Sequence, residues 1–275
     1  MSRYLHPASE RDIDRLGPAA HSVQLYEDAG EFRRMWEAAP WRVQVGPGGD
    51  AAILRPWREG RGVLALQALW CPESHVPRAI TDLESVARDQ GFARLLSPLV
   101  ASEAVRPYLR AHMTPCQSIV TFRMDSRSAQ EMRGQAPQGV VLRRAVPEDV
   151  PEILALDALC FDEFWSYGTK ELSDYLVTNR AAVAEGTDGL IGYTLCTVAG
   201  GAGTLGRLAI HPSARRRGVG TALLRDAVGY MARQDAAMVS LCTQEHNVAS
   251  RSLYTGVGMR ELPGRLELLM KELRR

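Results

Sequence analysis

The chain has 275 residues, of which 45% are hydrophobic and 24% charged, and its formal net charge is +1. These values are typical of a soluble globular protein, and the length predicts one large domain or two ordinary ones. The small net charge excludes a strong general attraction to nucleic acid or to an anionic membrane, so any such attraction must be local.

Five cysteines are scattered along the chain without a Cys-x-x-Cys pair. We therefore expect reduced, mostly buried thiols in a cytoplasmic protein. The first residues are charged, and no run of about 18 apolar residues occurs, so we expect no signal peptide and no membrane association. The histidines show no His-x-x-x-His spacing, and we expect no metal site.

Hydrophobic periodicity and turn signals predict ten elements before residue 125. In order they are a strand, two helices, three strands, a helix, a strand, a helix and a strand, at residues 4–6, 8–16, 28–38, 41–45, 51–57, 63–70, 80–90, 92–96, 102–112 and 118–124.

Residues 126–138 are polar and nearly free of large apolar side chains, which is typical of a linker. The second half then repeats the same order of elements, at residues 140–142, 147–160, 169–177, 181–184, 190–198, 205–210, 220–233, 238–242, 248–256 and 265–270.

The repeated order indicates an internal duplication. Residues 68–72 can be aligned with 208–212, and residues 108–113 with 254–259. We predict an α/β protein with two domains, 1–125 and 139–275, joined by the linker 126–138. Each domain is expected to be a central mixed sheet flanked by helices.

The stretch from Leu205 to Leu224 combines a short apolar strand, a basic glycine loop and the start of a helix. A helix N-terminus offers unpaired N–H groups and a partial positive charge. Glycines allow close approach of the backbone, and arginines add fixed charge. The stretch predicts a site for a phosphate or pyrophosphate, the alternative being a solvated basic turn.

This stretch resembles the acyl-CoA pyrophosphate loop of the GNAT superfamily of N-acyltransferases, Gln/Arg-x-x-Gly-x-Gly/Ala, with Arg215, Gly218 and Gly220 in the defined places. Residues 247–254 resemble the family's Asn-x-x-Ala/Ser-x-x-Leu/Phe-Tyr. The order of elements is also that of the GNAT fold. The resemblance covers essentially the whole chain, by motif from about residue 139 and by topology only before it.

The resemblance implies a tandem GNAT protein with a degenerate first copy, because residues 74–79 contain a proline and no glycine where the arginine–glycine loop belongs. In the second copy it implies a set of acyl-CoA contacts. These are Leu208, Ala209, Ile210, Arg215, Arg216, Arg217, Gly218, Val219, Gly220, Thr221, Asn247 and Tyr254.

Within this set, the strand backbone is expected to pair with the pantetheine amides, and an N–H near Leu208 or Ala209 to stabilise the oxyanion. Asn247 is expected to contact the pantetheine arm. Tyr254 is expected to protonate the departing thiolate, the alternative being a tyrosine that only packs its helix on the sheet.

No carboxylate stands in residues 239–244, where several relatives place the general base. Glu245 and His246 follow directly and could accept a proton, or could be loop surface. Cys242 could suggest a covalent acyl-enzyme, but we favour a small cysteine buried in its strand.

Residues 160–165 resemble the region that borders the acceptor pocket in ribosomal-protein alanine acetyltransferases. By this resemblance Asp162 and Glu163 would hold a cationic amine, and Trp165 would wall the pocket. The alternative is a helix end packed by aromatic side chains.

The expected function is transfer of an acetyl group from acetyl-CoA, or another short acyl-CoA, to a primary amine of a small molecule or of a peptide or protein N-terminus. We expect a monomer or homodimer that binds no nucleic acid. Two alternatives stay open: an acyl-CoA-binding sensor or interaction protein without turnover, and an arginine loop that binds nucleic-acid phosphate.

Overall fold

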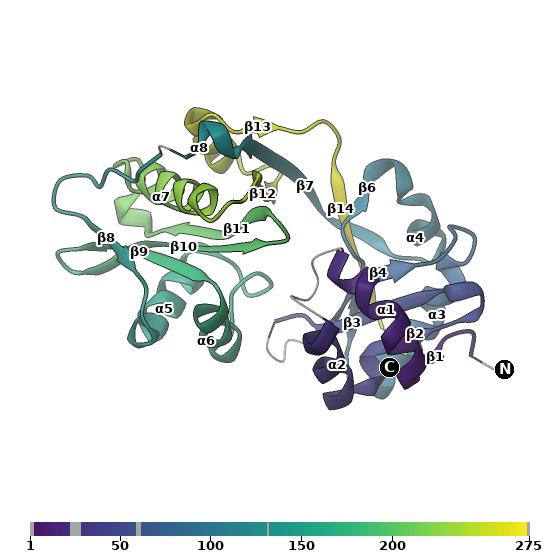
Figure 1. The fold of residues 1–275 in the computed structure, drawn as a ribbon. Coiled ribbons are helices and arrows are strands. Elements are labelled where there is room, and N and C mark those ends of the chain that lie inside the picture. Colours follow the sequence, from purple (N-terminus) through teal and green to yellow (C-terminus); the bar gives the residue numbers. More distant parts are fainter. Residues whose placement is uncertain (1–2, 23–28, 59–61, 131, 274–275) are drawn as a thin grey trace. The chain divides into compact units, whose positions relative to one another are not determined.

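A computed structural model describes residues 3–22, 29–58, 62–130 and 132–273 (Figure 1). Its backbone contacts divide the chain into two compact units. Unit 1 comprises Met1–Ser118 and Gly264–Arg275, and unit 2 comprises Ile119–Pro263. Each unit is a mixed sheet flanked by helices, which confirms the predicted fold class.

The sheet of unit 1 has the strand order β1-β2-β3-β4-β5-β14, and all of these pairs are antiparallel except β4 with β5. Its elements are β1 (His6–Pro7), α1 (Glu10–Ser22), α2 (Ala29–Ala38), β2 (Val43–Val45), β3 (Ala51–Pro56), β4 (Val63–Trp70), α3 (Val76–Asp89), β5 (Arg94–Leu96), β6 (Val100–Ala101), α4 (Arg106–Arg110), the start of β7 (Thr114–Asp125), and β14 (Leu266–Glu272).

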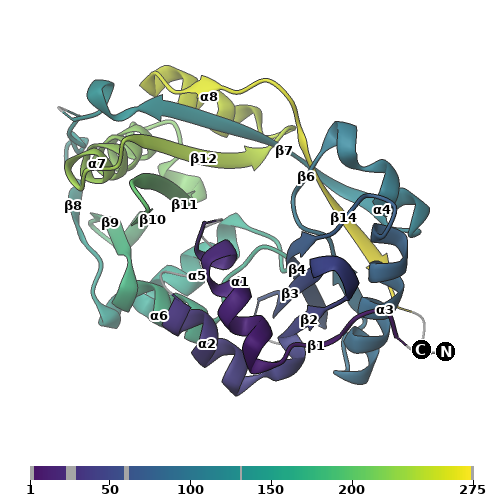
Figure 2. The same cartoon turned by 45° about the vertical axis from the view of Figure 1, so that its right-hand side comes forward.

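Helices cover both faces of this sheet (Figure 2). On one face, Ile13 of α1 and Phe32 of α2 pack against β2 and β3. On the other face, Ile80 and Leu83 of α3 pack against β4 and β5. The helical spacing of the apolar residues in α3 places them on one stripe, and burial of that stripe stabilises the helix more than its intrinsic propensity does.

Some predicted boundaries of unit 1 are wrong. α1 continues through Gly17 and Pro18 to Ser22, because the extra turn buries Ala20 completely. The helix predicted at 102–112 is a short 3₁₀ turn followed by α4. The predicted start of the second helix, Asp28, lies outside the described residues.

The sheet of unit 2 has the order β8-β9-β10-β11-β12-β7 and repeats the pairing pattern of unit 1, with β11 and β12 as the parallel pair. Its elements are β8 (Val141–Arg144), α5 (Val150–Cys160), α6 (Thr169–Thr178), β9 (Arg180–Gly186), β10 (Gly189–Ala199), β11 (Ala202–Ile210), α7 (Val219–Arg233), β12 (Met238–Gln244), α8 (Val248–Val257) and β13 (Arg260–Glu261), with the end of β7.

In unit 2, α7 and α8 lie on one face of the sheet and α5 and α6 on the other (Figure 1). Leu224 and Val228 of α7 pack against Val239 of β12. Ile153 of α5 and Leu172 of α6 pack against Tyr193 of β10. The parallel pair of strands is connected by α7, as α3 connects the parallel pair of unit 1.

The compact units do not follow the predicted domain boundaries of 1–125 and 139–275, because each unit takes its last long strand from the other half of the sequence. β7 follows the elements of unit 1, yet residues Ile119–Asp125 pair with β12 of unit 2. β14 ends the chain, yet it pairs with β5 and β6 of unit 1. Each strand has the apolar alternation that either sheet could accept, so local pattern does not decide its partner.

The segment 126–138, predicted to be a linker, belongs to unit 2 and packs against α7. Ala129 is fully buried. The carbonyl oxygen of Met132 lies so close to α7 that a Cβ on Gly229 would come within 2.1 Å of it. A Cβ on Gly134 would lie 2.4 Å from the carbonyl oxygen of Ala222. Two glycines, one on each side, therefore allow a close backbone contact that polarity alone does not predict.

Within the described part of the chain, none of the helices combines the length and the apolar character that crossing a membrane requires.

Candidate functional site

The parallel strands β11 and β12 of unit 2 separate partway along their length. They pair from Ala202↔Met238 to Leu205↔Leu241 and no further. A β-bulge at Gly206 follows immediately, since Leu195 of β10 pairs with Arg207 and Cys196 with Leu205. β12 then stays with β7, while β11 continues to Ile210 beside β10. Beyond Leu205, the β12-facing edge of β11 has no strand partner within the described parts of the chain, and we call it the bare edge.

The alternation of an antiparallel pair shows which backbone groups face this bare edge. The N–H of His211 donates to the carbonyl oxygen of Ile191 over 2.9 Å. By alternation, Ala209 also bonds to β10, and Leu208 and Ile210 turn their backbone groups away from it. The Ile210 carbonyl accepts from Arg215 Nε at 3.2 Å and Cys160 Sγ at 3.3 Å. The Leu208 N–H therefore faces the bare edge, and the Ala209 N–H is used in the pairing of β11 with β10.

The loop after β11 ends in a turn of left-handed residues. Arg216 has φ 61° and Gly218 has φ 84°. Gly218 is the N-cap of α7 and provides no side-chain cap. Because arginines 215–217 are exposed and the first N–H groups of α7 have no side-chain acceptor at this cap, the loop forms a concentrated positive site.

Gly220, in the first turn of α7, lies where two other elements approach. A Cβ at this position would be 3.3 Å from Leu253 of α8 and 3.5 Å from Ile210. A side chain at this position would therefore contact Ile210 and slightly crowd Leu253. The neighbouring Val219 is buried, and Thr221 is half-buried.

α8 carries the other two predicted acyl-CoA residues. Asn247 is its N-cap, and the side-chain oxygen accepts from the Ser250 N–H at 3.1 Å. Tyr254 is buried in the same apolar cluster as Leu208 and Leu253, with its ring edge-on to Phe122 at 5.3 Å. Burial raises the pKa of its hydroxyl, and a hydrogen bond with Ser250 opposes this. The phenol therefore keeps its proton at neutral pH.

The two candidate bases lie in the turn between β12 and α8. The carbonyl oxygen of Glu245 accepts from Arg251 Nη1 at 3.0 Å, which fixes the backbone of the turn. The Glu245 residue is half-buried, and His246 is exposed. Both follow the strand end directly, at the end of β12 that has separated from β11.

Cys242 is exposed, so the prediction of a buried strand cysteine is wrong. Its side chain lies on the sheet face that α7 and α8 do not cover, 3.5 Å from the Thr121 hydroxyl of β7. The apolar neighbours in β12 point to the other face. Of the five thiols, Cys196 alone is buried, so the broader expectation of mostly buried cysteines is also wrong.

The predicted acceptor residues lie in the loop after α5. Asp162 closes a turn: its side chain accepts from the Trp165 N–H at 3.2 Å, and its carbonyl from Ser166 Oγ at 2.8 Å. Glu163 is exposed. The rings of Phe164 and Trp165 meet edge-on at 5.1 Å. Asp162 thus holds the turn together while staying exposed, as Glu163 is, and Trp165 is half-buried.

A buried charged cluster, which the sequence analysis missed, connects this loop to β11. Asp157 of α5 is 1% exposed, and Arg207 is placed directly after the bulge with its Nε 3.5 Å from the Asp157 carboxylate. Arg207 also donates to the Trp165 carbonyl at 2.6 Å.

Aromatic groups complete the cluster. The guanidinium lies over the rings of Phe161 and Tyr167, at 4.0 Å and 4.3 Å. Tyr193 donates its hydroxyl proton to Asp157, and burial raises the pKa of that hydroxyl. A lone arginine in the apolar stretch LGRLAI and a lone aspartate in LALDALC were the available sequence signal, since buried charges need partners.

Among the described residues, no group of three or more histidine, cysteine, aspartate or glutamate side chains is placed to hold a metal ion. The polar groups at the strand separation suit an extended ligand with an anionic end. The bare strand edge offers hydrogen bonds, and the loop before α7 offers positive charge.

Comparison with known proteins agrees with this geometry. Residues 150–259 match the model of the acetyltransferase (GNAT) family. No curated protein matches the sequence of the chain. Among solved structures, a GCN5-related N-acetyltransferase from Sphaerobacter thermophilus is similar over 98% of this chain and 96% of its own, with 18% identity and a TM-score of 0.70.

A tandem GNAT protein from the clavulanic acid biosynthesis pathway is similar over 98% of both chains, with 14% identity and a TM-score of 0.68. A Drosophila protein is similar over 99% of this chain and 100% of its own, with 14% identity and a TM-score of 0.67. At these identities the structures show the fold, which they share along nearly the whole chain.

Proposed function

We propose, from the match of residues 150–259 to the model of the acetyltransferase (GNAT) family, that unit 2 transfers an acetyl group from acetyl-CoA, or another short acyl-CoA, to a primary amine. The observation that supports this best is the separation of β11 from β12 beside the start of α7. A bare strand edge, a positive helix end and the buried Tyr254 occur together there.

The parts of an acyl-CoA correspond to these features. The pyrophosphate binds the first N–H groups of α7 and the side chains of arginines 215–217. The pantetheine amides pair with the bare edge at Leu208, as an added strand would. Asn247 uses its side-chain oxygen to cap α8, so its amide NH₂ group is the part that contacts the arm.

In the reaction, the neutral amine attacks the thioester carbonyl carbon, and a C–N bond forms. The carbonyl oxygen gains negative charge and accepts a hydrogen bond from the Leu208 N–H. The C–S bond then breaks, and the thiolate takes the Tyr254 proton. The amine nitrogen then releases a proton to a base, and this proton finally returns to the Tyr254 oxygen and restores the phenol.

The base is the turn residue Glu245 or His246, acting directly or through water. Both lie at the end of β12 that diverges from β11. Asp162, Glu163 and Trp165 are the proposed acceptor contacts. Their chemistry suits a cationic amine that loses its proton on binding, either a small molecule or a peptide N-terminus.

A second candidate is an acyl-CoA-binding protein without turnover. It is favoured by one observation: residues 239–244 of β12 contain no carboxylate. The two functions predict the same binding and differ only in whether acyl-CoA is consumed when an amine is present.

Calorimetry with acetyl-CoA, CoA and a short RNA tests binding, and a panel of amines and peptide N-termini with detection of free thiol tests turnover. We expect acetyl-CoA binding and thiol release with at least one amine. Binding without release across the panel would favour the sensor. Absence of acetyl-CoA binding at millimolar concentration, or tighter binding of RNA, would overturn the proposal.

A further inference from the structure

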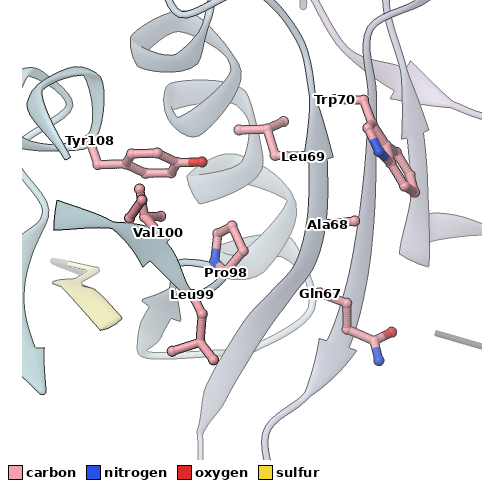
Figure 3. A pocket seen from close by; sticks show the side chains of 9 residues that line it. Gln67, Ala68, Leu69, Trp70, Pro98, Leu99, Val100 and Tyr108 are labelled. Carbon is pink, nitrogen blue, oxygen red and sulfur yellow. The ribbon is translucent and has the colours of Figure 1, made fainter. Parts of the chain in front are cut away.

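Unit 1 contains its own cavity, at the place where β4 and β5 separate. The cavity has a volume of about 400 Å³. Leu69 and Trp70 of β4 line one side, and Leu99, Val100 and Tyr108 line the other (Figure 3). Cavities of this size hold small ligands, because binding pockets start at about 300 Å³.

One wall of the cavity is a bare strand edge. β4 pairs with β5 from Val63↔Arg94 to Ala65↔Leu96 and no further. A β-bulge at Gln67 follows, since Ile53 of β3 pairs with Ala68 and Leu54 with Leu66. The Gly62 carbonyl accepts a hydrogen bond from the Arg94 N–H, so the backbone of Gly62 faces β5, and the backbone groups of successive β4 residues face β3 and β5 in turn. Past the bulge, this alternation turns the N–H and C=O of Leu69 away from β3, towards the cavity.

Tyr108 provides a polar side chain inside the cavity. The residue is 8% exposed, and Figure 3 shows its hydroxyl pointing between Leu69 and Val100. Within the described parts of the chain the hydroxyl has no hydrogen-bond partner. Burial, as the main cause, and the nearby Cys71, as the smaller one, raise the pKa of this hydroxyl to about 12, so the hydroxyl is neutral. The hydroxyl is therefore a donor that a ligand in the cavity can use.

The helix that follows β4 does not provide a phosphate site. His75, the N-cap of α3, has its Nδ1 2.9 Å from the carboxylate of the buried Asp50 and 2.8 Å from the Tyr4 hydroxyl. Pro77 has no N–H, and the Val76 N–H donates to the Glu73 carbonyl. Of the residues 74–79 that replace the arginine–glycine loop, Arg78 is the one arginine, and its guanidinium lies over the Tyr4 ring at 4.6 Å, while the preceding turn carries the exposed Glu73. An anionic ligand therefore finds few donors here.

We propose that unit 1 binds a small neutral molecule that carries a secondary amide and a short apolar arm, without phosphate. The amide N–H and C=O pair with the backbone of Leu69, Tyr108 donates to the second lone pair of the amide oxygen, and the apolar arm lies against Leu99. Two sources share this chemistry: an N-acylated amine, and a pantetheine arm that lacks its nucleotide. The proposal does not depend on the activity of unit 2.

Ligand-observed NMR on the full chain tests this, with N-butylacetamide and pantetheine as probes of the two sources. The Gly220→Glu variant, which disables the phosphate site of unit 2, is the background. We expect saturation transfer to at least one probe and weak or absent transfer to CoA. Stronger binding of N-butylacetamide would identify N-acylated amines as the class, and stronger binding of pantetheine the pantetheine arm.

Two further variants, each in the Gly220→Glu background, locate the site. Tyr108→Phe removes only a hydroxyl and should weaken binding about fivefold, the loss of one hydrogen bond. Leu99→Glu, at a residue 47% exposed, should weaken it further. Leu109→Glu is the matched control, 43% exposed and outside the cavity, and should bind as the background does.

Circular dichroism confirms that each variant is folded. The proposal is overturned if neither probe binds at about 10 mM, a concentration that detects affinities worth only about 3 kcal/mol. It is also overturned if Tyr108→Phe and Leu99→Glu both bind as the background does, or if CoA binds more tightly than pantetheine with the same dependence on Leu99.

Discussion

Unit 1 and unit 2 build the same strand separation and surround it differently. In both, the parallel pair ends at a β-bulge, at Gln67 in unit 1 and Gly206 in unit 2. The helix after the second parallel strand, α4 in unit 1 and α8 in unit 2, is closed by the same kind of backbone bond. The Met113 N–H donates to the Tyr108 carbonyl in unit 1, and the Met259 N–H donates to the Tyr254 carbonyl in unit 2. The bulges place Leu69 in register with Leu208, one residue away from the alignment of Ala68 with Leu208 that the sequence suggested.

The differences lie at the two ends of each bare edge. At the N-terminus of the connecting helix, unit 2 has an exposed arginine–glycine turn before α7. Unit 1 has His75 before α3, and its side chain is hydrogen-bonded to Asp50. Directly after the bulge, unit 2 has the buried Arg207, and unit 1 has Ala68. A fold can thus keep its hydrogen-bonding edge while the charge beside it, and with it the class of ligand, changes.

The buried charge of unit 2 gives the largest expected effect. Arg207→Met should lower the free energy of unfolding by about 3 kcal/mol, because it leaves Asp157 buried without its cation. Urea denaturation measures this. Lys170→Ala breaks the exposed pair with Asp174 and should change stability by less than about 0.5 kcal/mol. Equal, small effects of both changes would contradict a structural function for Arg207.

The phosphate end of unit 2 is tested by Gly220→Glu. The side chain would meet Leu253 and Ile210 and place negative charge in the anion site, so the affinity for acetyl-CoA should fall at least about hundredfold. Calorimetry measures the change. Gly256→Glu adds the same charge on α8, where a Cβ meets nothing within 4 Å, and should keep the affinity. Wild-type affinity in Gly220→Glu would exclude this loop as the phosphate site.

The proton donor is tested by Tyr254→Phe, which should slow acyl transfer about hundredfold and leave CoA affinity nearly unchanged. Burial raises the pKa of Tyr254, so the proton is present throughout the neutral range and is lost only as pH rises above about 10. The rate between about pH 7 and pH 9 should therefore show no decline from this group. Tyr230→Phe, on α7, is the control; unchanged turnover in Tyr254→Phe would remove the acid role.

The smallest effects concern the segment 126–138. Gly229→Ala should destabilise the chain by about 2 kcal/mol, because the new methyl group would collide with the Met132 carbonyl. Gly256→Ala, at an open helical position, should stabilise it by about 0.5–1 kcal/mol. Thermal unfolding separates the two. Stabilisation by both would show that this segment does not pack on α7 and is a free linker.

Much of the molecule could be predicted from local pattern. The order of elements, the duplication and the loop before α7 follow from apolar periodicity, glycines and arginines. The exchange of β7 and β14 could not, because both strands alternate in the same way and strand partners are a long-range choice. The register of Leu69 depends on a bulge, and the Arg207–Asp157 pair depends on two elements that are far apart in sequence.

The number of acetyl-CoA molecules bound per chain tests the central comparison most directly. Calorimetric titration of the full chain should give one site, which disappears in Gly220→Glu, because unit 2 alone combines the bare edge with a positive helix end. Two sites per chain, or one site that persists in Gly220→Glu, would contradict the account.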